Sequence, residues 1–256
     1  MRQRIDIARE AILSAGSFIR EMFAREDTGE IEEKDRNDFV TQADRISERM
    51  ITETLARAFP EAGIMGEETG RRSDRDEVWV IDPLDGTTNF IHGYPSVGLS
   101  IALLRGGKSV LGLVFDPLRE ELFEAVSGEG ARCNGRPIHV SGATSLSESL
   151  LGTGFPFRVE SHLDSYIASF RELFMACRGV RRAGAAVLDL SHVAAGRLDG
   201  FWELYLKPWD MAAGALIIEE AGGKVSDLYG GEGFLPAGNI VAGNPAVHAA
   251  ILEVTS

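Results

Sequence analysis

The sequence contains little cysteine, since only Cys133 and Cys177 occur in 256 residues. They are far apart and form no CxxC pattern, which excludes a disulfide framework and the usual ligand spacing of a structural zinc site. Free thiols are typical of a reducing compartment. The first residues, MRQRIDIAREAILSAGSFIREMFARE, lack the apolar core and the small-residue cleavage site of a signal peptide. We therefore expect a cytoplasmic protein.

Positive charge is also scarce. The chain has 26 Lys and Arg against 39 Asp and Glu, a formal net charge of −13. Such an excess disfavours nucleic acid or an anionic membrane surface as the main partner. Segment 86–104 carries no charged residue, but Asn89, His92, Pro95 and several glycines exclude a membrane helix there. An acidic surface can simply aid solubility, whereas a phosphate-bearing substrate would require a cation, such as a bound metal ion.

Apolar residues make up 44% of the chain, enough for a sizeable core. Their recurrence at three- and four-residue steps predicts helices at 5–22 and 42–59, the second ending before Pro60. The intervening TGEIEEKDRND predicts a turn with an exposed strand or loop. Shorter apolar runs then predict strands at 63–65, 78–81, 97–104, 110–115 and 121–126.

After Ser141 strands and helices alternate. We expect strands at 149–153, 179–182, 200–204 and 238–242, and helices at 161–177, 187–195, 209–221 and from 245 onward. This alternation predicts a layered α/β (α+β) architecture. The Gly- and Ser-containing stretch 141–147 is the best boundary. It divides the chain into an N-terminal α+β lobe, 1–145, and a C-terminal α/β lobe, 146–256, which together form one catalytic unit.

Residues 79–90 read WVIDPLDGTTNF, which places two acids directly after an apolar strand. Asp82 ends the predicted strand, Pro83 fixes the turn, and Asp85 can face the same point as Asp82, with the Leu84 carbonyl between them. Hard cations such as Mg²⁺ take oxygen ligands of this kind. Gly86 permits close approach, and the amides of residues 86–88 would open a helix whose N-terminus suits phosphate.

Two other interpretations of this motif exist. Asp85 could be an ordinary N-cap after an Asp-Pro turn. The motif also resembles the D-x-D-G-T strand end of phosphatases with an aspartate nucleophile, but here two residues separate the acids.

Two further clusters place acids near the ends of predicted elements. Gly66-Glu67-Glu68 follows a short strand, and KPWDMAAGALIIEEAGG places Asp210 at the start of an apolar helix. Taken alone, the first could be a solvated acidic turn and the second a plain N-cap. We interpret the pair Arg181-Arg182 as solvated, although it could also neutralise substrate charge or line a subunit interface.

These three clusters occur in the order GEE, WVIDPLDGTTNF and WDMAAGALIIEEAGG, preceded by DFVTQAD at 38–44. In this order they resemble the inositol monophosphatase family, within the superfamily that includes fructose-1,6-bisphosphatase, and the resemblance covers nearly the whole chain. It implies a layered α-β-α-β-α fold, Mg²⁺-dependent hydrolysis of phosphate monoesters, homodimers and inhibition by Li⁺.

The resemblance also implies the ligands of two or three Mg²⁺ ions. Glu67, Asp82 and the Leu84 carbonyl resemble ligands of the first ion, and Asp82, Asp85 and Asp210 resemble those of the second. Asp44 is similar to a family acid that serves a third ion through water, and a helix-start acid is an equally good interpretation of it.

Roles in catalysis and substrate binding follow from the same resemblance. Glu67, Thr87 and Asp82 are the expected catalytic residues, acting on the attacking water. Asp85, Gly86, Thr87, Thr88 and Asp210 are expected around the phosphate. Glu203 and the segment Gly184-Ala185-Ala186 resemble residues that face the ring of the substrate. The alternative interpretation is purely structural, with Glu203 an acid at the end of a strand and the segment a tightly packed helix start.

Thr88-Asn89-Phe90 favours the inositol branch of the superfamily, so the leading substrate is myo-inositol-1-phosphate. The alternative is a fructose-1,6-bisphosphatase or another sugar or nucleotide phosphatase. A remote alternative is a non-catalytic binding or regulatory subunit, against which the intact acid set counts.

Overall fold

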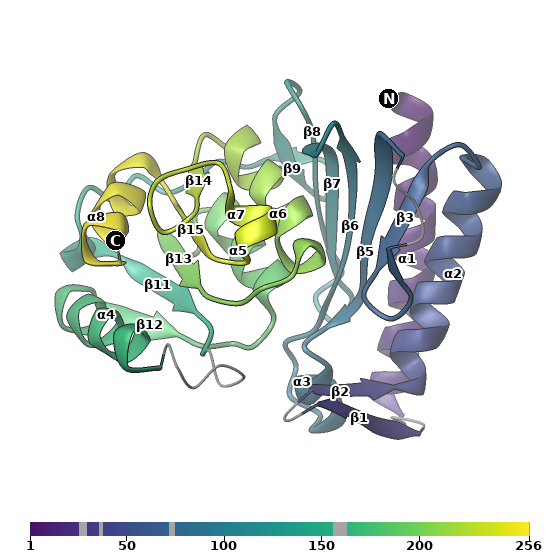
Figure 1. Ribbon diagram of the computed structural model, residues 1–256, viewed down its shortest axis with the longest axis horizontal. Helices are drawn as coiled ribbons and strands as arrows, with labels where there is room; N and C mark the ends of the chain where they lie inside the picture. Colours follow the sequence, from purple (N-terminus) through teal and green to yellow (C-terminus); the bar gives the residue numbers. More distant parts are fainter. Residues whose placement is uncertain (26–29, 36–37, 72–74, 156–162, 256) are drawn as a thin grey trace.

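The chain folds into five layers, α-β-α-β-α, which confirms the layered α/β architecture predicted from the sequence and the layer order implied by the family resemblance (Figure 1). The computed structural model describes residues 1–25, 30–35, 38–71, 75–155 and 163–255. Helices α1 and α2 form one outer layer, followed by an eight-stranded sheet, a middle layer with α5 and α6, a five-stranded sheet, and a second outer layer with α4 and α8. In the described residues no helix combines the length and the apolarity that crossing a bilayer requires.

The first outer layer consists of two amphipathic helices, α1 (Arg2–Ala24) and α2 (Gln42–Ala58). Both helices lie where the sequence predicts them. Helix α2 ends before Pro60, because a proline disfavours helical geometry at the residue that precedes it. Between them lie β1 (Ile31–Asp35) and β2 (Asp38–Thr41), an antiparallel pair beside the short helix α3 (Figure 1). The predicted exposed strand is therefore one half of a two-stranded ribbon.

The eight-stranded sheet has the order β10-β9-β8-β7-β6-β5-β3-β4. Only β3 and β5 pair in parallel, and every other neighbouring pair is antiparallel. Helices cover both faces, which is why β5 reads as a continuous apolar run. The strands are β3 (Gly63–Gly66), β4 (Gly70–Arg71), β5 (Glu77–Asp85), β6 (Gly98–Arg105), β7 (Lys108–Asp116), β8 (Glu121–Val126), β9 (Ala131–Cys133) and β10 (Arg136–Pro137).

Strand β5 differs from its prediction at the functionally important end. It runs on to Asp85 and does not stop at Asp82, with a shift in its register against β6 between these two residues. Pro83 has no N–H group and cannot join the hydrogen-bond ladder, so the strand bulges there and continues. Helix α3 (Thr87–Ile91) follows and is only five residues long.

The five-stranded sheet has the order β12-β11-β13-β15-β14. Strand β11 is parallel to β12 and β13, whereas β15 is antiparallel to both of its neighbours. Its strands are β11 (Leu150–Thr153), β12 (Gly179–Arg181), β13 (Gly200–Glu203), β14 (Lys224–Ser226) and β15 (Ile240–Gly243). The accompanying helices are η1 (Leu146–Glu148), α4 (Leu163–Ala176), α5 (Ala186–Ala194), α6 (Pro208–Glu220), α7 (Phe234–Ala237) and α8 (Pro245–Thr255). The first two residues of the helix predicted at 161–177 lie outside the described residues.

The middle layer joins the two sheets into one core. Helix α6 is apolar on nearly all sides because a sheet covers each of its faces. It approaches β7 so closely that a Cβ on Gly112 would lie 2.8 Å from the Ala213 carbonyl oxygen. The lobe boundary at 145 stays a prediction, and it falls between β10, which ends at Pro137, and β11, which begins at Leu150.

Candidate active site

A cavity of about 370 Å³ opens where the two sheets and the middle layer meet. Its walls are the C-terminal ends of β3, β5, β11 and β13, helix α3, and the N-terminal ends of α5 and α6. All the predicted site residues except Asp44 line it: Glu67, Asp82, Leu84, Asp85, Gly86, Thr87, Thr88, Gly184, Ala185, Ala186, Glu203 and Asp210. Residues that are far apart in the sequence therefore line one cavity.

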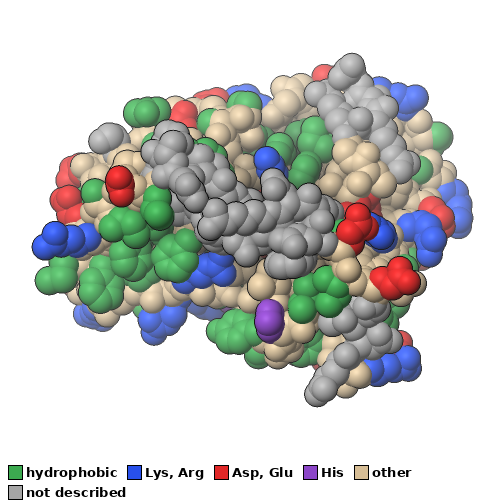
Figure 2. Space-filling view, turned by 60° about the horizontal axis from the view of Figure 1, so that its bottom comes forward, with side chains coloured by type: hydrophobic (Ala, Val, Ile, Leu, Met, Phe, Trp, Pro, Cys, Tyr) green, Lys and Arg blue, Asp and Glu red, His purple; other side chains and the backbone are tan. Residues whose placement is uncertain are grey.

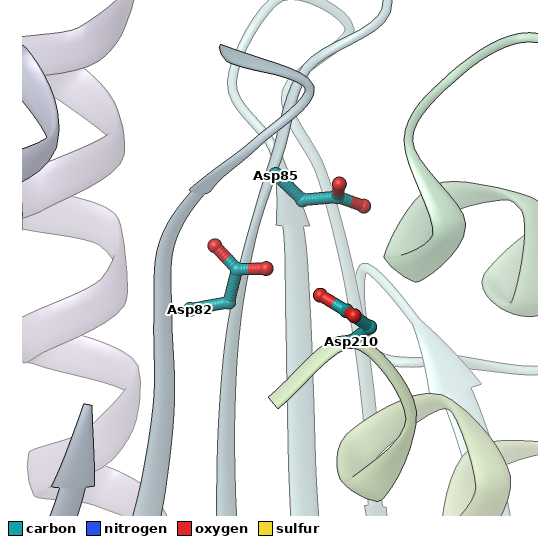
Figure 3. Close-up of side chains that lie close together, drawn as sticks. All are labelled: Asp82, Asp85 and Asp210. Atoms are coloured by element: carbon teal, nitrogen blue, oxygen red, sulfur yellow. The ribbon is translucent and has the colours of Figure 1, made fainter. Parts of the chain in front are cut away.

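Three carboxylates converge in this cavity, as Figure 3 shows. Asp82, Asp85 and Asp210 each offer an oxygen, and these oxygens all lie within 4.8 Å of one another. Two come from the end of β5 and the third from the first turn of α6, where Asp210 Oδ2 accepts a hydrogen bond of 2.6 Å from the amide of Lys207. Asp210 is therefore not the N-cap residue of α6, which is Lys207, but it completes the cap from inside the helix.

The cluster is electrostatically unfavourable without a cation. Burial, with the negative charges of Glu67, Asp85 and Asp210, raises the pKa of Asp82 well above its usual range. Burial and Asp210 raise the pKa of Asp85 in the same direction. Asp82 is buried, and Asp85 and Asp210 are half-buried. Closely spaced oxygen ligands of this kind are what Mg²⁺ or another hard cation binds, so these residues fit a divalent metal ion.

Asp85 also joins the two halves of the chain. Its Oδ2 accepts a 2.8 Å hydrogen bond from the amide of Val187 on α5, across 102 positions of sequence. The interpretation of Asp85 as an N-cap is wrong, because Gly86 is the N-cap residue of α3 and no side chain caps that helix. Gly86 adopts φ 89°, and a Cβ there would lie 2.7 Å from the Ser96 carbonyl oxygen, so only glycine fits.

Asp44 lies beneath the cavity and does not line it. Its Oδ2 accepts hydrogen bonds from the amide and the hydroxyl of Thr41, and the bond from the amide is one half of the capping box of α2. Its Oδ1 accepts a hydrogen bond of 3.0 Å from the Thr87 hydroxyl. Burial raises the pKa of Asp44. The same hydroxyl lies 3.1 Å from the Leu84 carbonyl oxygen. Asp44 thus orients Thr87 from behind, and its role at a third ion stays a prediction.

The opposite wall contains two further acids, Glu203 at the end of β13 and Asp189 on α5. Burial, then the charges of Asp210, Asp189 and Asp85, raises the pKa of Glu203 well above its usual range. Burial raises the pKa of Asp189 to about 7, although Arg182 opposes the shift. The Glu203 carboxylate occupies the space above Gly154, where an added Cβ would lie 1.8 Å from Oε1.

Sequence reasoning missed several lining residues, among them Thr153, Gly154, Phe155 and Asp189. Asp189 carried a signal, because it is the one acid in AAVLDLSHVAA, a stretch that is mostly apolar. The interpretation of Arg182 as a solvated residue is incomplete. It is exposed, but it lines the cavity with its guanidinium carbon 5.6 Å from the ring centre of Phe155.

Comparison with known proteins agrees with this geometry. The model of the inositol monophosphatase family matches residues 1–256. A relative from Pseudomonas aeruginosa named Nus factor SuhB is 50% identical over 258 residues, covering 98% of this chain and 95% of the relative. The protein of that name from Escherichia coli is 45% identical over 254 residues, covering 98% and 95%.

Two solved structures have the same fold. The extragenic suppressor protein suhB from Bartonella henselae superposes with a TM-score of 0.95 at 38% identity, covering 99% of this chain and 98% of that one. The inositol monophosphatase from Anabaena gives a TM-score of 0.89 at 40% identity, covering 99% and 95%. A match along the whole sequence, the shared five-layer fold and the carboxylate cluster together make this chain a member of the inositol monophosphatase family.

Proposed function

We propose that the protein hydrolyses a small phosphate monoester in a Mg²⁺-dependent reaction, with myo-inositol-1-phosphate as the leading substrate. The observation that carries this proposal is the convergence of Asp82, Asp85 and Asp210 in a cavity of about 370 Å³ whose other wall carries Glu203. Family membership supports it, as does the name of the Anabaena structure.

The metal ligands would be Asp82, Asp85 and Asp210 for one ion, and Glu67, Asp82 and the Leu84 carbonyl for another, with Asp44 available to a third. When bound, Mg²⁺ would supply Lewis acidity toward a phosphate oxygen and toward water. These assignments give a role to four of the six acids that line the cavity, namely Glu67, Asp82, Asp85 and Asp210. The other two acids are Asp189 and Glu203, and the cationic lining residues are Arg182 and Lys207.

Thr87 and Asp44 would handle the proton of the attacking water. The Thr87 hydroxyl donates to Asp44 Oδ1, so its own lone pairs are left to accept a hydrogen bond from water. As the water oxygen attacks phosphorus, its proton can pass to Thr87 Oγ1 while the hydroxyl proton moves to Asp44, whose raised pKa suits an acceptor. Glu67, on the same cavity wall, is the alternative acceptor. The P–O ester bond breaks as the alkoxide leaves, and no protein nucleophile takes part.

The far wall favours a polyol over a second phosphate. Glu203 and Asp189 can exchange hydrogen bonds with hydroxyl groups, and in their ionised forms both would repel a second phosphate. We therefore favour inositol monophosphate over the alternatives, which are fructose-1,6-bisphosphate and other sugar or nucleotide phosphates. Amides of Gly86, Thr87 and Thr88 would hold the phosphate, and the backbone of 184–186 would face the ring.

The second candidate is a binding or regulatory role. The relatives with 45% and 50% identity carry the name Nus factor SuhB, and this name denotes no enzyme. Such a role needs the fold but not the chemistry, and the complete acid set counts against it as the only role.

The proposal includes a homodimer in the cytoplasm. Helix α4 exposes an apolar face whose side chains are unusually large for a solvent-facing position, with Met175 77% exposed beside Leu163, Ile167 and Phe174. Hydrophobic side chains gather on this side of the molecule in Figure 2. A second copy covering this face would bury it. Light scattering should report a dimer for the wild type and a monomer for Phe174→Glu, and a monomeric wild type would refute this part.

Phosphate release from a panel of substrates tests the main proposal. The panel is inositol-1-phosphate, fructose-1,6-bisphosphate, histidinol phosphate and 3′-phosphoadenosine-5′-phosphate, each with Mg²⁺ and again with EDTA. We expect release from inositol-1-phosphate that EDTA abolishes and Li⁺ inhibits. Stronger release from another substrate would select another branch, and no release from any would leave the binding role.

A further inference from the structure

Three buried polar side chains on α2 lie directly beneath the cavity. Asp44, Ser47 and Glu48 are 0%, 0% and 2% exposed and share one helix face, because residues three and four apart project in the same direction. Each hydrogen-bonds a different segment of the site. Asp44 accepts from the Thr87 hydroxyl, Ser47 Oγ donates 2.8 Å to the Pro83 carbonyl, and Glu48 Oε2 accepts 2.7 Å from the amide of Glu68.

The Glu48 contact fixes the backbone next to Glu67. The amide of Glu67 donates 3.2 Å to the carbonyl of Ile81, the residue before Asp82 on β5. The next amide, that of Glu68, is the one bound by Glu48. Both peptide N–H groups that flank the side chain of Glu67 are therefore held, one by the strand that carries Asp82 and the other by α2. Glu48 itself does not line the cavity.

The contact requires glycine at position 66. An ideal Cβ there would lie 2.6 Å from Glu48 Cδ and Oε2, and 2.8 Å from Oε1, so any side chain would push the carboxylate away. Gly66 has no positive φ, which means that close approach and not backbone conformation demands the glycine.

Burial of the Glu48 side chain also destabilises the fold. Its Oε1 is buried and has no hydrogen-bond partner in the part of the chain that the structure describes. An unsatisfied buried acceptor costs about 1–3 kcal/mol and calls for an explanation beyond packing. A carboxylate buried at that cost next to a cavity residue points to a role in the site.

We propose that Glu48 is a positioning residue that sets where the Glu67 carboxylate lies, and thereby controls divalent metal binding through Glu67. The proposal rests on the proposed function for the assignment of Glu67 as a metal ligand.

Mn²⁺ binding to the metal-free protein, followed by electron paramagnetic resonance, tests this without any turnover. Glu48→Ala should weaken Mn²⁺ binding about tenfold or more, as loss of a residue that orients a metal ligand does. Glu48→Gln retains an acceptor for the amide of Glu68 and should bind within about twofold of the wild type. Thr54→Ala is the matched control and should leave binding unchanged. Thr54 lies on α2, and within the described residues its hydroxyl donates to the Met50 carbonyl of the same helix and to no group of the cavity.

Gly66→Ala gives an independent test of the same contact. Its methyl group should displace Glu48 and weaken Mn²⁺ binding as Glu48→Ala does, whereas Glu48→Ala/Gly66→Ala should be no weaker than Glu48→Ala alone. Amide hydrogen exchange should show faster exchange at 67 and 68 in Glu48→Ala, with the core unchanged.

Several outcomes would overturn the inference. The first is a wild-type Mn²⁺ affinity in Glu48→Ala, or in Gly66→Ala if Glu48→Ala does not fold. The second is a double variant whose loss of affinity equals the sum of the two single losses. The third is a wild type that does not bind Mn²⁺. A wild type that binds Mn²⁺ but releases no phosphate would refute the proposed function alone.

Discussion

Asp189→Asn should stabilise the protein at alkaline pH and not at acidic pH. Asp189 is 3% exposed on α5, and burial raises its pKa from 3.8 to about 7. The folded state therefore holds this proton more tightly than the unfolded chain does. Below the unfolded pKa both states are protonated and the group has no effect. As pH rises toward 7 the unfolded chain ionises first, so the free energy of unfolding falls, and above 7 the loss is complete.

The size of the effect follows from the same two values. A difference of about 3 pKa units corresponds to ~4 kcal/mol, which is the ceiling for the penalty at high pH. Because Asp189 lines an open cavity, solvent screens part of its charge, and we expect Asp189→Asn to add only about 1–2 kcal/mol to the free energy of unfolding at high pH.

Urea unfolding with EDTA present, at about pH 5 and about pH 8, measures this difference. The increase in the free energy of unfolding caused by Asp189→Asn should be large at the higher pH and small at the lower one. Asp76→Asn replaces an exposed aspartate and is the control. Its effect on the free energy of unfolding should be small and equal at the two pH values. An equal effect of Asp189→Asn at both pH values would refute the reasoning, because a change in packing alone carries no pH dependence.

Three further predictions concern the cavity. Asp210→Asn should reduce Mg²⁺-dependent phosphate release at least about a hundredfold while circular dichroism stays unchanged, because the asparagine oxygen can still accept from the Lys207 amide; retained turnover would defeat the assignment of Asp210 as a ligand. Glu203→Gln should change the ratio of kcat/KM between inositol and non-inositol substrates by a factor that corresponds to about 1–3 kcal/mol of transition-state free energy. Equal losses of kcat/KM on both substrates would show that Glu203 does not select the substrate. Gly154→Ala should reproduce that change, because its Cβ would lie 1.8 Å from Glu203 Oε1 and displace the carboxylate; a Glu203→Gln/Gly154→Ala variant worse than Glu203→Gln alone would contradict this.

Local patterns were enough to predict most of the fold. The helices at α1 and α2 and most strands follow from apolar periodicity, which reports burial directly. The end of β5 was not predictable in this way, because Pro83 ordinarily terminates a strand. Here β6 continues beside it and re-pairs with Asp85 after the bulge. The pairing partner that decides the matter lies outside the local sequence.

The site divides along the same line. Asp82, Asp85 and Asp210 lie at the ends of elements, within motifs that resemble a known family, and the sequence alone pointed to them. Glu48 and Asp189 lie inside helices. An acid on a polar helix such as that of Glu48 looks like a surface residue, and Asp189, although it stands alone in a mostly apolar stretch, gives no sign in the sequence of what it contacts. Their importance depends on what packs against them: the Glu68 amide twenty residues away from Glu48, and the wall shared by Asp189 and Glu203. Such contacts are set by tertiary structure, and no spacing rule reveals them.

The energetics of the carboxylates also bear on the choice between catalysis and binding alone. Burial and mutual repulsion raise the pKa values of Asp82 and Asp85, so this cluster opposes folding at neutral pH unless a cation compensates. A protein that used only its outer surface would be more stable with asparagine or an apolar residue at these positions. A divalent cation that binds only the folded state reverses the balance, since it adds RT ln(1 + [L]/Kd) to the free energy of unfolding. Mg²⁺ should accordingly raise the Tm of the wild type, and it should raise that of Asp210→Asn by less, because this variant keeps only the ligands of the other ion. A wild type whose Tm does not respond to Mg²⁺ would remove the physical reason for the cluster and favour the binding role.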